Sequence, residues 1–167
     1  MTSAGDAGDL AALQGEVAQI RDARAVEALK HSYTNALDSD YDLDAIGALF
    51  TPDARWVADG FGDYRGREAI VAFFEQLAQT VVTVRHFATS PLIEVAADGM
   101  TATARWNLLC LCARRHRDDP AVEVPVVEVG TYRDTCVKVD GRWYFSELSV
   151  DVAFSRQVGD LVRTPRR

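Results

Sequence analysis

The sequence predicts an α+β fold in which a strongly curved sheet wraps around N-terminal helices and encloses a pocket. Apolar residues recur at helical spacing in the first half of the chain, as at Leu29 and Leu37. After residue 81, long strand-like stretches follow, and Asp98-Gly99 and Asp140-Gly141 mark tight hairpin turns between them. Because helices and sheet must each bury an apolar face, we expect the sheet to curve into a cone closed by helices.

The helical elements come first along the chain. Apolar residues at three- and four-residue spacing over 10–20, and in shifted phase over 26–37, predict two consecutive helices or one kinked helix ending near Asp38. A short helix over 43–50 is expected to stop at Thr51-Pro52, because a residue before proline disfavours helical geometry. A further helix is expected over 68–81.

The strands have clear limits in the sequence. Short strands are expected around Gly60 and Gly62. The third of the long strands is expected to start after Pro125, because proline cannot donate a hydrogen bond to a sheet ladder. The expected strands cover 54–58, 63–64, 82–95, 101–114, 126–139 and 142–154. We expect a disordered N-terminus over 1–8, one domain over 9–155 and a tail over 156–167.

Composition narrows the class of protein. A chain of 167 residues, 48% hydrophobic and 26% charged, fits one globular domain that can enclose a small cavity. Its net charge of -7 argues against nucleic acid or an anionic membrane as a partner. No stretch approaches the ~18 apolar residues of a spanning helix, and no signal peptide is recognisable. Three cysteines without a CxxC pair indicate free thiols in a reducing compartment, so we expect a cytoplasmic protein.

We expect no metal and no cofactor. Cys110 and Cys112 project from one face of a strand, but no thiolate or imidazole partner lies at ligand spacing. The alternating aspartates from Asp38 to Asp44 begin like a calcium loop. Leu43 and Leu49, however, occupy the positions where that loop requires glycine and glutamate.

Three residues carry the chemistry that the sequence points to, namely Tyr33, Asp38 and His86. A neutral imidazole held by a carboxylate can accept and return a proton, and a phenol can donate a hydrogen bond to a carbonyl oxygen. The alternatives are a core aromatic for Tyr33, a helix-terminating residue for Asp38 and a satisfied rim residue for His86. On an ideal helix, Tyr33 and Asp38 would point about 140° apart, so Asp38 is expected where the helix ends.

Several segments together resemble the SnoaL-like branch of the NTF2-like superfamily. They are DARAVEALKHSYTNALDSDYDLDAIGALFTPDARW, DYRGREAIVAFF, RHF, TATARWNL and VDGRWYF. The pattern is most similar to scytalone dehydratases, bile-acid dehydratases and hexachlorocyclohexane dehydrochlorinases, which need no cofactor. The resemblance implies that Asp38 orients His86, which acts as base, and that Tyr33 polarises a substrate carbonyl. This chain lacks the second histidine and the late arginine of the two dehydratase groups, so the resemblance leaves the substrate open.

Aromatic residues are the expected walls of the pocket, although plain core packing is the alternative for each. The candidates for substrate binding are Trp56, Trp106, Tyr132, Phe73 and Tyr64. The expected activity is a dehydratase-like elimination on a small hydrophobic, cyclic hydroxy-ketone. The alternatives are an isomerase or polyketide cyclase, or a non-catalytic binding or dimerisation domain.

Two further features of the strands stand out. Asn107 and Asp134 lie on central strands, where a polar side chain needs a partner. Leu109 and Leu111 are expected to face outward from the sheet, and a homo-oligomer, a dimer or trimer, would cover them.

Overall fold

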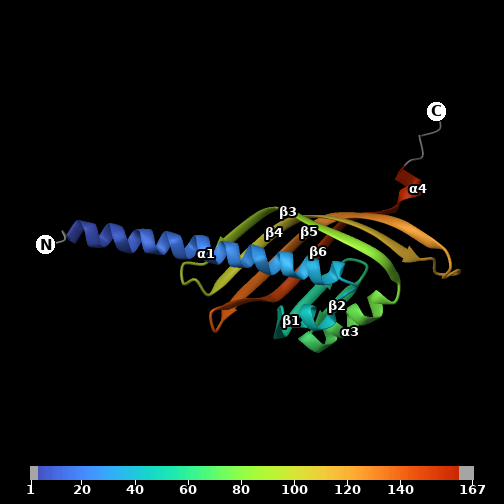
Figure 1. The fold of residues 1–167 in the computed structure, drawn as a ribbon, viewed down its shortest axis with the longest axis horizontal. Helices are drawn as coiled ribbons and strands as arrows, with labels where there is room; N and C mark the ends of the chain where they lie inside the picture. The colour runs from blue at the N-terminus through green and yellow to red at the C-terminus, as the bar shows by residue number, and fades with distance from the viewer. Residues whose placement is uncertain (1–3, 162–167) are drawn as a thin grey trace.

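The computed structural model describes residues 4–161 and confirms the predicted fold class: helices first, then a strongly curved sheet (Figure 1). The helices are α1 (Ala4–Asp38), α2 (Leu43–Gly47), α3 (Arg67–Ala78) and α4 (Val158–Leu161). The strands are β1 (Phe50–Ala58), β2 (Gly62–Arg65), β3 (Val81–Val95), β4 (Thr101–Arg115), β5 (Glu123–Val139) and β6 (Arg142–Gln157).

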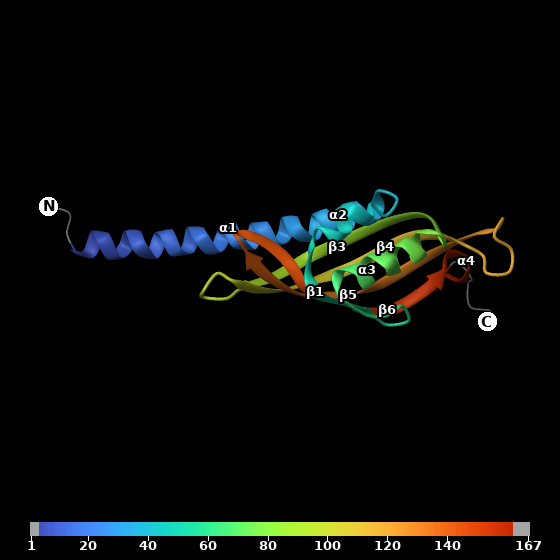
Figure 2. The ribbon, with the colours of Figure 1, turned by 90° about the horizontal axis from the view of Figure 1, so that it is seen from below.

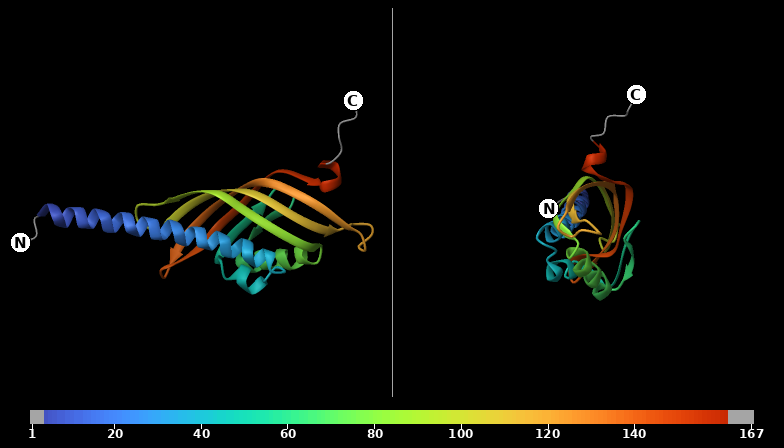
Figure 3. Two further views of the ribbon diagram at one scale, coloured as in Figure 1. Left: turned by 45° about the horizontal axis from the view of Figure 1, so that its top comes forward. Right: turned by 90° about the vertical axis from the view of Figure 1, so that its right-hand side faces the viewer.

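The six strands of the described residues form one mixed sheet in the order β2-β1-β6-β5-β4-β3. Among them, β1 and β6 pair in parallel, and the other neighbours are antiparallel. The end-on view shows the sheet curling around the interior (Figure 3). The ladder shifts register between Val129 and Gly130, where a Cβ on Gly130 would lie only 2.3 Å from the carbonyl oxygen of Asp151. Glycine therefore permits a close approach of β5 to β6 at this irregularity.

The C-terminal half of α1 supplies much of the core, with Val26, Tyr33 and Leu37 almost fully buried. The N-terminal half of the same helix projects beyond the sheet (Figures 1 and 2). There Leu10 and Ile20 are 57% and 61% exposed. The second half of α1 is therefore the part of this helix that contributes to the site.

The helix α1 is continuous, where the sequence left open two helices or a kinked one. The phase shift near Asp22 marks the point where the helix reaches the sheet, because Trp143 Nε1 donates to Asp22 there at 3.1 Å and Lys138 pairs with the same carboxylate. The helix begins at Ala4, inside the segment 1–8 that was expected to be disordered.

Two boundaries that were placed by proline differ from the structure. The segment expected as a helix over 43–50 is helical only to Gly47, and β1 begins at Phe50 with Pro52 inside it. Pairing of β1 with β6 is interrupted between Phe50 and Arg55, so the missing N–H of Pro52 removes no bond of that ladder.

The strand β5 begins at Glu123 rather than after Pro125. Pro125 pairs with Ala113 of β4, whereas the ladder between β5 and β6 starts only at Val126. Pro125 has no N–H group, but this costs no hydrogen bond to β6, because β6 does not pair with β5 at that position. At the other end of the chain, β6 and α4 extend into the predicted tail, and residues 162–167 of that tail lie outside the described part.

Candidate functional site

The side chains of His86 and Asp38 are in direct hydrogen-bond contact. Asp38 Oδ1 lies 2.8 Å from His86 Nδ1. The same carboxylate also accepts from the backbone N–H of His86, at 3.0 Å to Oδ1 and 3.1 Å to Oδ2. In the contact between the side chains, Nδ1–H of the ring donates to the carboxylate. A neutral imidazole held in this way has an unprotonated Nε2 on its other side. The side chains are only 12% and 17% exposed, so solvent screens this contact weakly.

The pair forms where the last turn of α1 meets the free edge of the sheet. His86 belongs to β3, which pairs within residues 4–161 with β4 alone. Asp38 is the last residue of α1, and Asp40 and Tyr41 then adopt left-handed backbone conformations with φ of 53° and 57°. Arg85 Nη1 donates to the carbonyl oxygen of Asp38 at 3.0 Å, which places a cation at the helix C-terminus.

The ring of His86 lines an apolar cavity inside the cone. The walls come from α1, the β1–β2 turn, α3 and strands β1 and β3–β6, with Leu37, Phe74 and Leu108 among the apolar members. Asp38 does not line this cavity and lies behind the histidine. The arrangement places the imidazole between a carboxylate and a mostly apolar space, as a proton-transfer site requires.

Tyr33 lines the same cavity from the middle of the buried part of α1. Trp56 Nε1 donates to its hydroxyl oxygen at 2.9 Å, and no acceptor for its hydroxyl hydrogen is present among the described residues. Burial raises the pKa of Tyr33 far above its ordinary value, so the phenol stays protonated. Its hydrogen is therefore available to a ligand oxygen.

The five aromatic residues predicted for substrate binding separate into two groups. Trp56 and Tyr132 line the cavity. Trp106 is buried elsewhere in the cone and donates from Nε1 to Asp134 at 2.9 Å. Phe73 stacks on Tyr64 with 4.4 Å between ring centroids and lies 4.7 Å from the ring of Trp56. Phe73 and Tyr64 thus support Trp56 from behind and do not contribute to the cavity wall.

A buried ion pair that the sequence did not predict lies beside the cavity. Lys30 Nζ lies 2.9 Å from the Asp134 carboxylate, and the two side chains are 0% and 1% exposed. The ammonium group also lies 3.7 Å from the ring centroid of Tyr132, which lines the cavity. Burial lowers the pKa of Lys30 and raises that of Asp134, against their mutual attraction. The sequence does carry one signal of this burial: Lys30 lies on the apolar stripe of α1, between Val26 and Tyr33.

All three cysteines are free and buried, as predicted, and Cys110 and Cys112 line the cavity. A hydrogen bond from Cys110 lowers the pKa of Cys112 to about 7, with the Arg114 guanidinium acting in the same direction against burial. Burial raises the pKa of Cys136 to about 12. Among the described residues, no group of three or more histidine, cysteine or acidic side chains gathers as a metal site.

Cys112 is expected to react with iodoacetamide through its thiolate. Because the thiolate fraction rises as pH passes through about 7, the rate at pH 8 should exceed that at pH 6 by about tenfold. Peptide mass spectrometry of Cys112→Ser, with Cys136→Ser as the matched control, checks this. Equal labelling of wild type and Cys112→Ser would contradict the assignment of the reactive thiol.

The helix-filled cone with one mixed sheet and an interior cavity is an NTF2-like fold. The SnoaL-like domain family matches residues 18–149, and the chain belongs to this family. No curated protein matches the chain. None of the helices in the described part of the chain has the length and apolar character needed to cross a membrane.

Solved structures share this fold over most of the chain. A scytalone dehydratase-like protein from Novosphingobium aromaticivorans is 24% identical with a TM-score of 0.73, over 84% of this chain and 90% of that one. Hexachlorocyclohexane dehydrochlorinase type 3 from Novosphingobium barchaimii is 18% identical with a TM-score of 0.75, over 90% and 99%. An NTF2-like protein with a cystatin-like fold from N. aromaticivorans is 21% identical with a TM-score of 0.65, over 92% of each chain. At these identities the likeness establishes the fold.

Proposed function

We propose that this protein is a cofactor-independent lyase that removes water from a small hydrophobic, cyclic hydroxy-ketone. The observation that carries the proposal is the orientation of His86, whose Nδ1 is bound by Asp38 while its ring lines a cavity shared with the Tyr33 phenol. The structural likeness to a scytalone dehydratase-like protein and to a dehydrochlorinase supports a scaffold suited to elimination.

Each group has a defined part in the reaction. Nε2 of His86 removes the proton on the carbon next to the substrate carbonyl, and Asp38 stabilises the imidazolium that forms. Tyr33 donates to the carbonyl oxygen as it gains negative charge. The electron pair of the broken C–H bond then expels the β-hydroxyl as the C=C bond forms. The imidazolium returns its proton to that hydroxyl, so one water leaves and His86 is neutral again.

The same proton transfer also serves an isomerase or a polyketide cyclase, in which the imidazolium returns the proton to carbon or oxygen without loss of water. Trp56 and Tyr132 would contact an apolar ring in either reaction. We expect the protein to work in the reducing cytoplasm, a setting that suits its three free thiols.

Mass spectrometry of the protein purified from its own host tests this proposal. We expect native spectra of an Asp38→Asn variant to show a retained small molecule, because substrate binds but turns over slowly. Wild-type protein should convert that molecule into a product lighter by one water. A product of equal mass would favour isomerisation, and a ligand that wild-type protein leaves unchanged would favour a binding domain.

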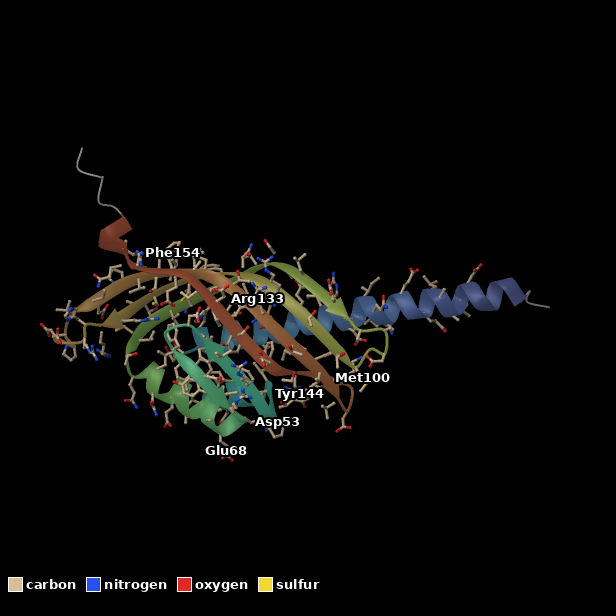
Figure 4. All side chains as sticks on the ribbon, turned by 180° about the vertical axis from the view of Figure 1, so that it is seen from behind. Asp53, Glu68, Met100, Arg133, Tyr144 and Phe154 are labelled. Carbon is tan, nitrogen blue, oxygen red and sulfur yellow. The ribbon has the colours of Figure 1, made fainter. Side chains whose placement is uncertain are left out.

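We also propose that the protein forms a homo-oligomer, a dimer or trimer, through the outer face of the sheet. Phe87, Leu109, Val129 and Phe154 form one row across β3, β4, β5 and β6. Their outward faces remain apolar, with Phe87 46%, Leu109 39% and Phe154 36% exposed (Figure 4, where Phe154 is labelled). An apolar row of this extent is typical of an interface.

Light scattering after size-exclusion chromatography is expected to give the mass of a dimer or trimer for wild-type protein. Leu109→Glu should shift it to the monomer, because a carboxylate would be buried without a partner at the interface. Ile20→Glu, on the projecting part of α1, is the matched control and should leave the mass unchanged. A monomeric wild type at micromolar concentration would refute the oligomer.

A further inference from the structure

A second charged pair, Arg114 with Glu128, lines the cavity away from the Asp38–His86 pair. Glu128 of β5 pairs in register with Cys110 of β4, and Cys110 pairs with His86 of β3. Because the strands of a sheet lie ~4.8 Å apart, two steps place Glu128 about 10 Å from His86 across the inner face. The cavity therefore has two polar positions separated by apolar wall.

The contacts of Glu128 leave one of its oxygens unused. Its Oε1 accepts from Arg114 Nη2 at 2.9 Å and from Ser155 Oγ at 3.1 Å. No partner for Oε2 is present among the described residues, although Glu128 is only 6% exposed. Oε2 is not sealed from the cavity, because the buried side-chain atoms without a partner in the described residues are Thr51 Oγ1 and Arg114 Nε. It can therefore accept from a ligand group that displaces solvent there.

Arg114 also has unused hydrogen-bonding capacity. Its Nε is buried and has no hydrogen-bond partner in the described part of the chain. Its guanidinium lies 5.3 Å from the ring centroid of Phe61, another residue of the cavity wall. Arg114 and Glu128 together thus offer one spare donor and one spare acceptor beside an aromatic ring.

We propose that Arg114 and Glu128 form a subsite that recognises a neutral hydroxyl group on the distal ring of the substrate. A hydroxyl donates to Glu128 Oε2 and accepts from the guanidinium, so it satisfies both open groups. A ligand carboxylate accepts only and is repelled by Glu128, which already neutralises the arginine. This proposal rests on the proposed function in one respect: the substrate ketone must occupy the end of the cavity near Tyr33 and His86.

The two polar positions suggest the kind of probe to use. The backbones are about 10 Å apart and both side chains reach into the space between them, so we choose a small bicyclic ketone with its hydroxyl on the far ring. The matched probes are therefore 1-tetralone, 6-hydroxy-1-tetralone and 6-carboxy-1-tetralone. They differ only in the group that would reach Arg114 and Glu128.

Calorimetric titration of the full chain with the three tetralones tests the subsite. Wild-type protein should bind the hydroxyl compound about tenfold more tightly than 1-tetralone, as expected for a hydrogen bond to a charged group, and the carboxyl compound most weakly. Glu128→Gln should remove the preference for hydroxyl and strengthen binding of the carboxyl compound at least about tenfold, because Arg114 is then unpaired. Arg114→Gln should weaken binding of the carboxyl compound, because it removes the cation.

The matched control is Glu147→Gln, which removes an exposed carboxylate paired with Arg55 outside the cavity. It should keep the wild-type order of affinities for the three tetralones. His86→Gln should also keep that order, so a failure of the elimination chemistry and a failure of the subsite are separable. The proposal is wrong if none of the tetralones binds wild-type protein, or if folded Glu128→Gln and Arg114→Gln both retain the wild-type order.

Discussion

Asp38→Asn is expected to lower kcat about 10²- to 10⁴-fold, the usual contribution of a positioned acid–base group. The carboxylate now accepts from both the backbone N–H and the Nδ1–H of His86. An amide has only one oxygen. We expect it at the Oδ2 position, where it keeps the bond from the backbone N–H of His86, so that the NH₂ group takes the Oδ1 position and donates to Nδ1. The ring would then favour the tautomer with hydrogen on Nε2, which cannot act as a base toward the cavity. Initial rates on the molecule recovered from the host measure the effect.

Asp40→Asn is the control for this substitution, because Asp40 is exposed, lies two residues away and has a φ of 53° that asparagine also tolerates. It should leave kcat unchanged. Nitrogen-detected NMR of the imidazole provides a readout that needs no substrate: hydrogen on Nδ1 in wild type, and on Nε2 in Asp38→Asn. A wild-type rate in a folded Asp38→Asn protein would rule out the proposed role of the pair.

Asp134→Asn should destabilise the protein by about 3–5 kcal/mol, the range measured when one partner of a buried ion pair is removed. The loss is large because Lys30 is fully buried and has no route to water that avoids unfolding. Asparagine keeps an oxygen for Trp106 Nε1, which isolates the effect of charge. Urea unfolding monitored by circular dichroism gives the free energy of unfolding.

The double variant Lys30→Met with Asp134→Asn is expected to recover most of that loss, because it buries no charge. Asp63→Asn is the comparison for an exposed pair, since the Arg55 and Asp63 side chains are 29% and 43% exposed. Its loss should be much smaller, because solvent screens an exposed pair. An equal loss in Asp134→Asn and Asp63→Asn would show that burial does not set the cost.

Sequence patterns predicted the parts of this fold that depend on local chemistry. The hairpin at Asp140-Gly141 has positive φ at both residues, as the tight turn predicted there requires. The contact of Asp38 with His86 could be anticipated because the helix ends at Asp38 and the resemblance supplied its strand partner. Local periodicity alone would not have joined residues so far apart in the chain.

The remaining features depend on tertiary contacts that spacing does not encode. Lys30 lies on the apolar stripe of α1, but its partner Asp134 comes near only when β5 is placed beside the helix across the cone. The pairing of Arg114 with Glu128 requires the register of β4 against β5. Trp106 was expected in the pocket wall on its aromatic character. It is instead buried away from the cavity, where its Nε1 donates to Asp134. These two residues meet only when β4 and β5 pair in the folded sheet.

The contact of Asp38 with the backbone N–H of His86 has a consequence for aggregation. The strand β3 is a 15-residue strand at the edge of the sheet, and long edge strands invite pairing with strands of other molecules. Asp38 occupies an edge N–H in the middle of that strand, and α1 packs beside it. The aspartate that orients the proposed base therefore also protects the sheet from edge-to-edge association.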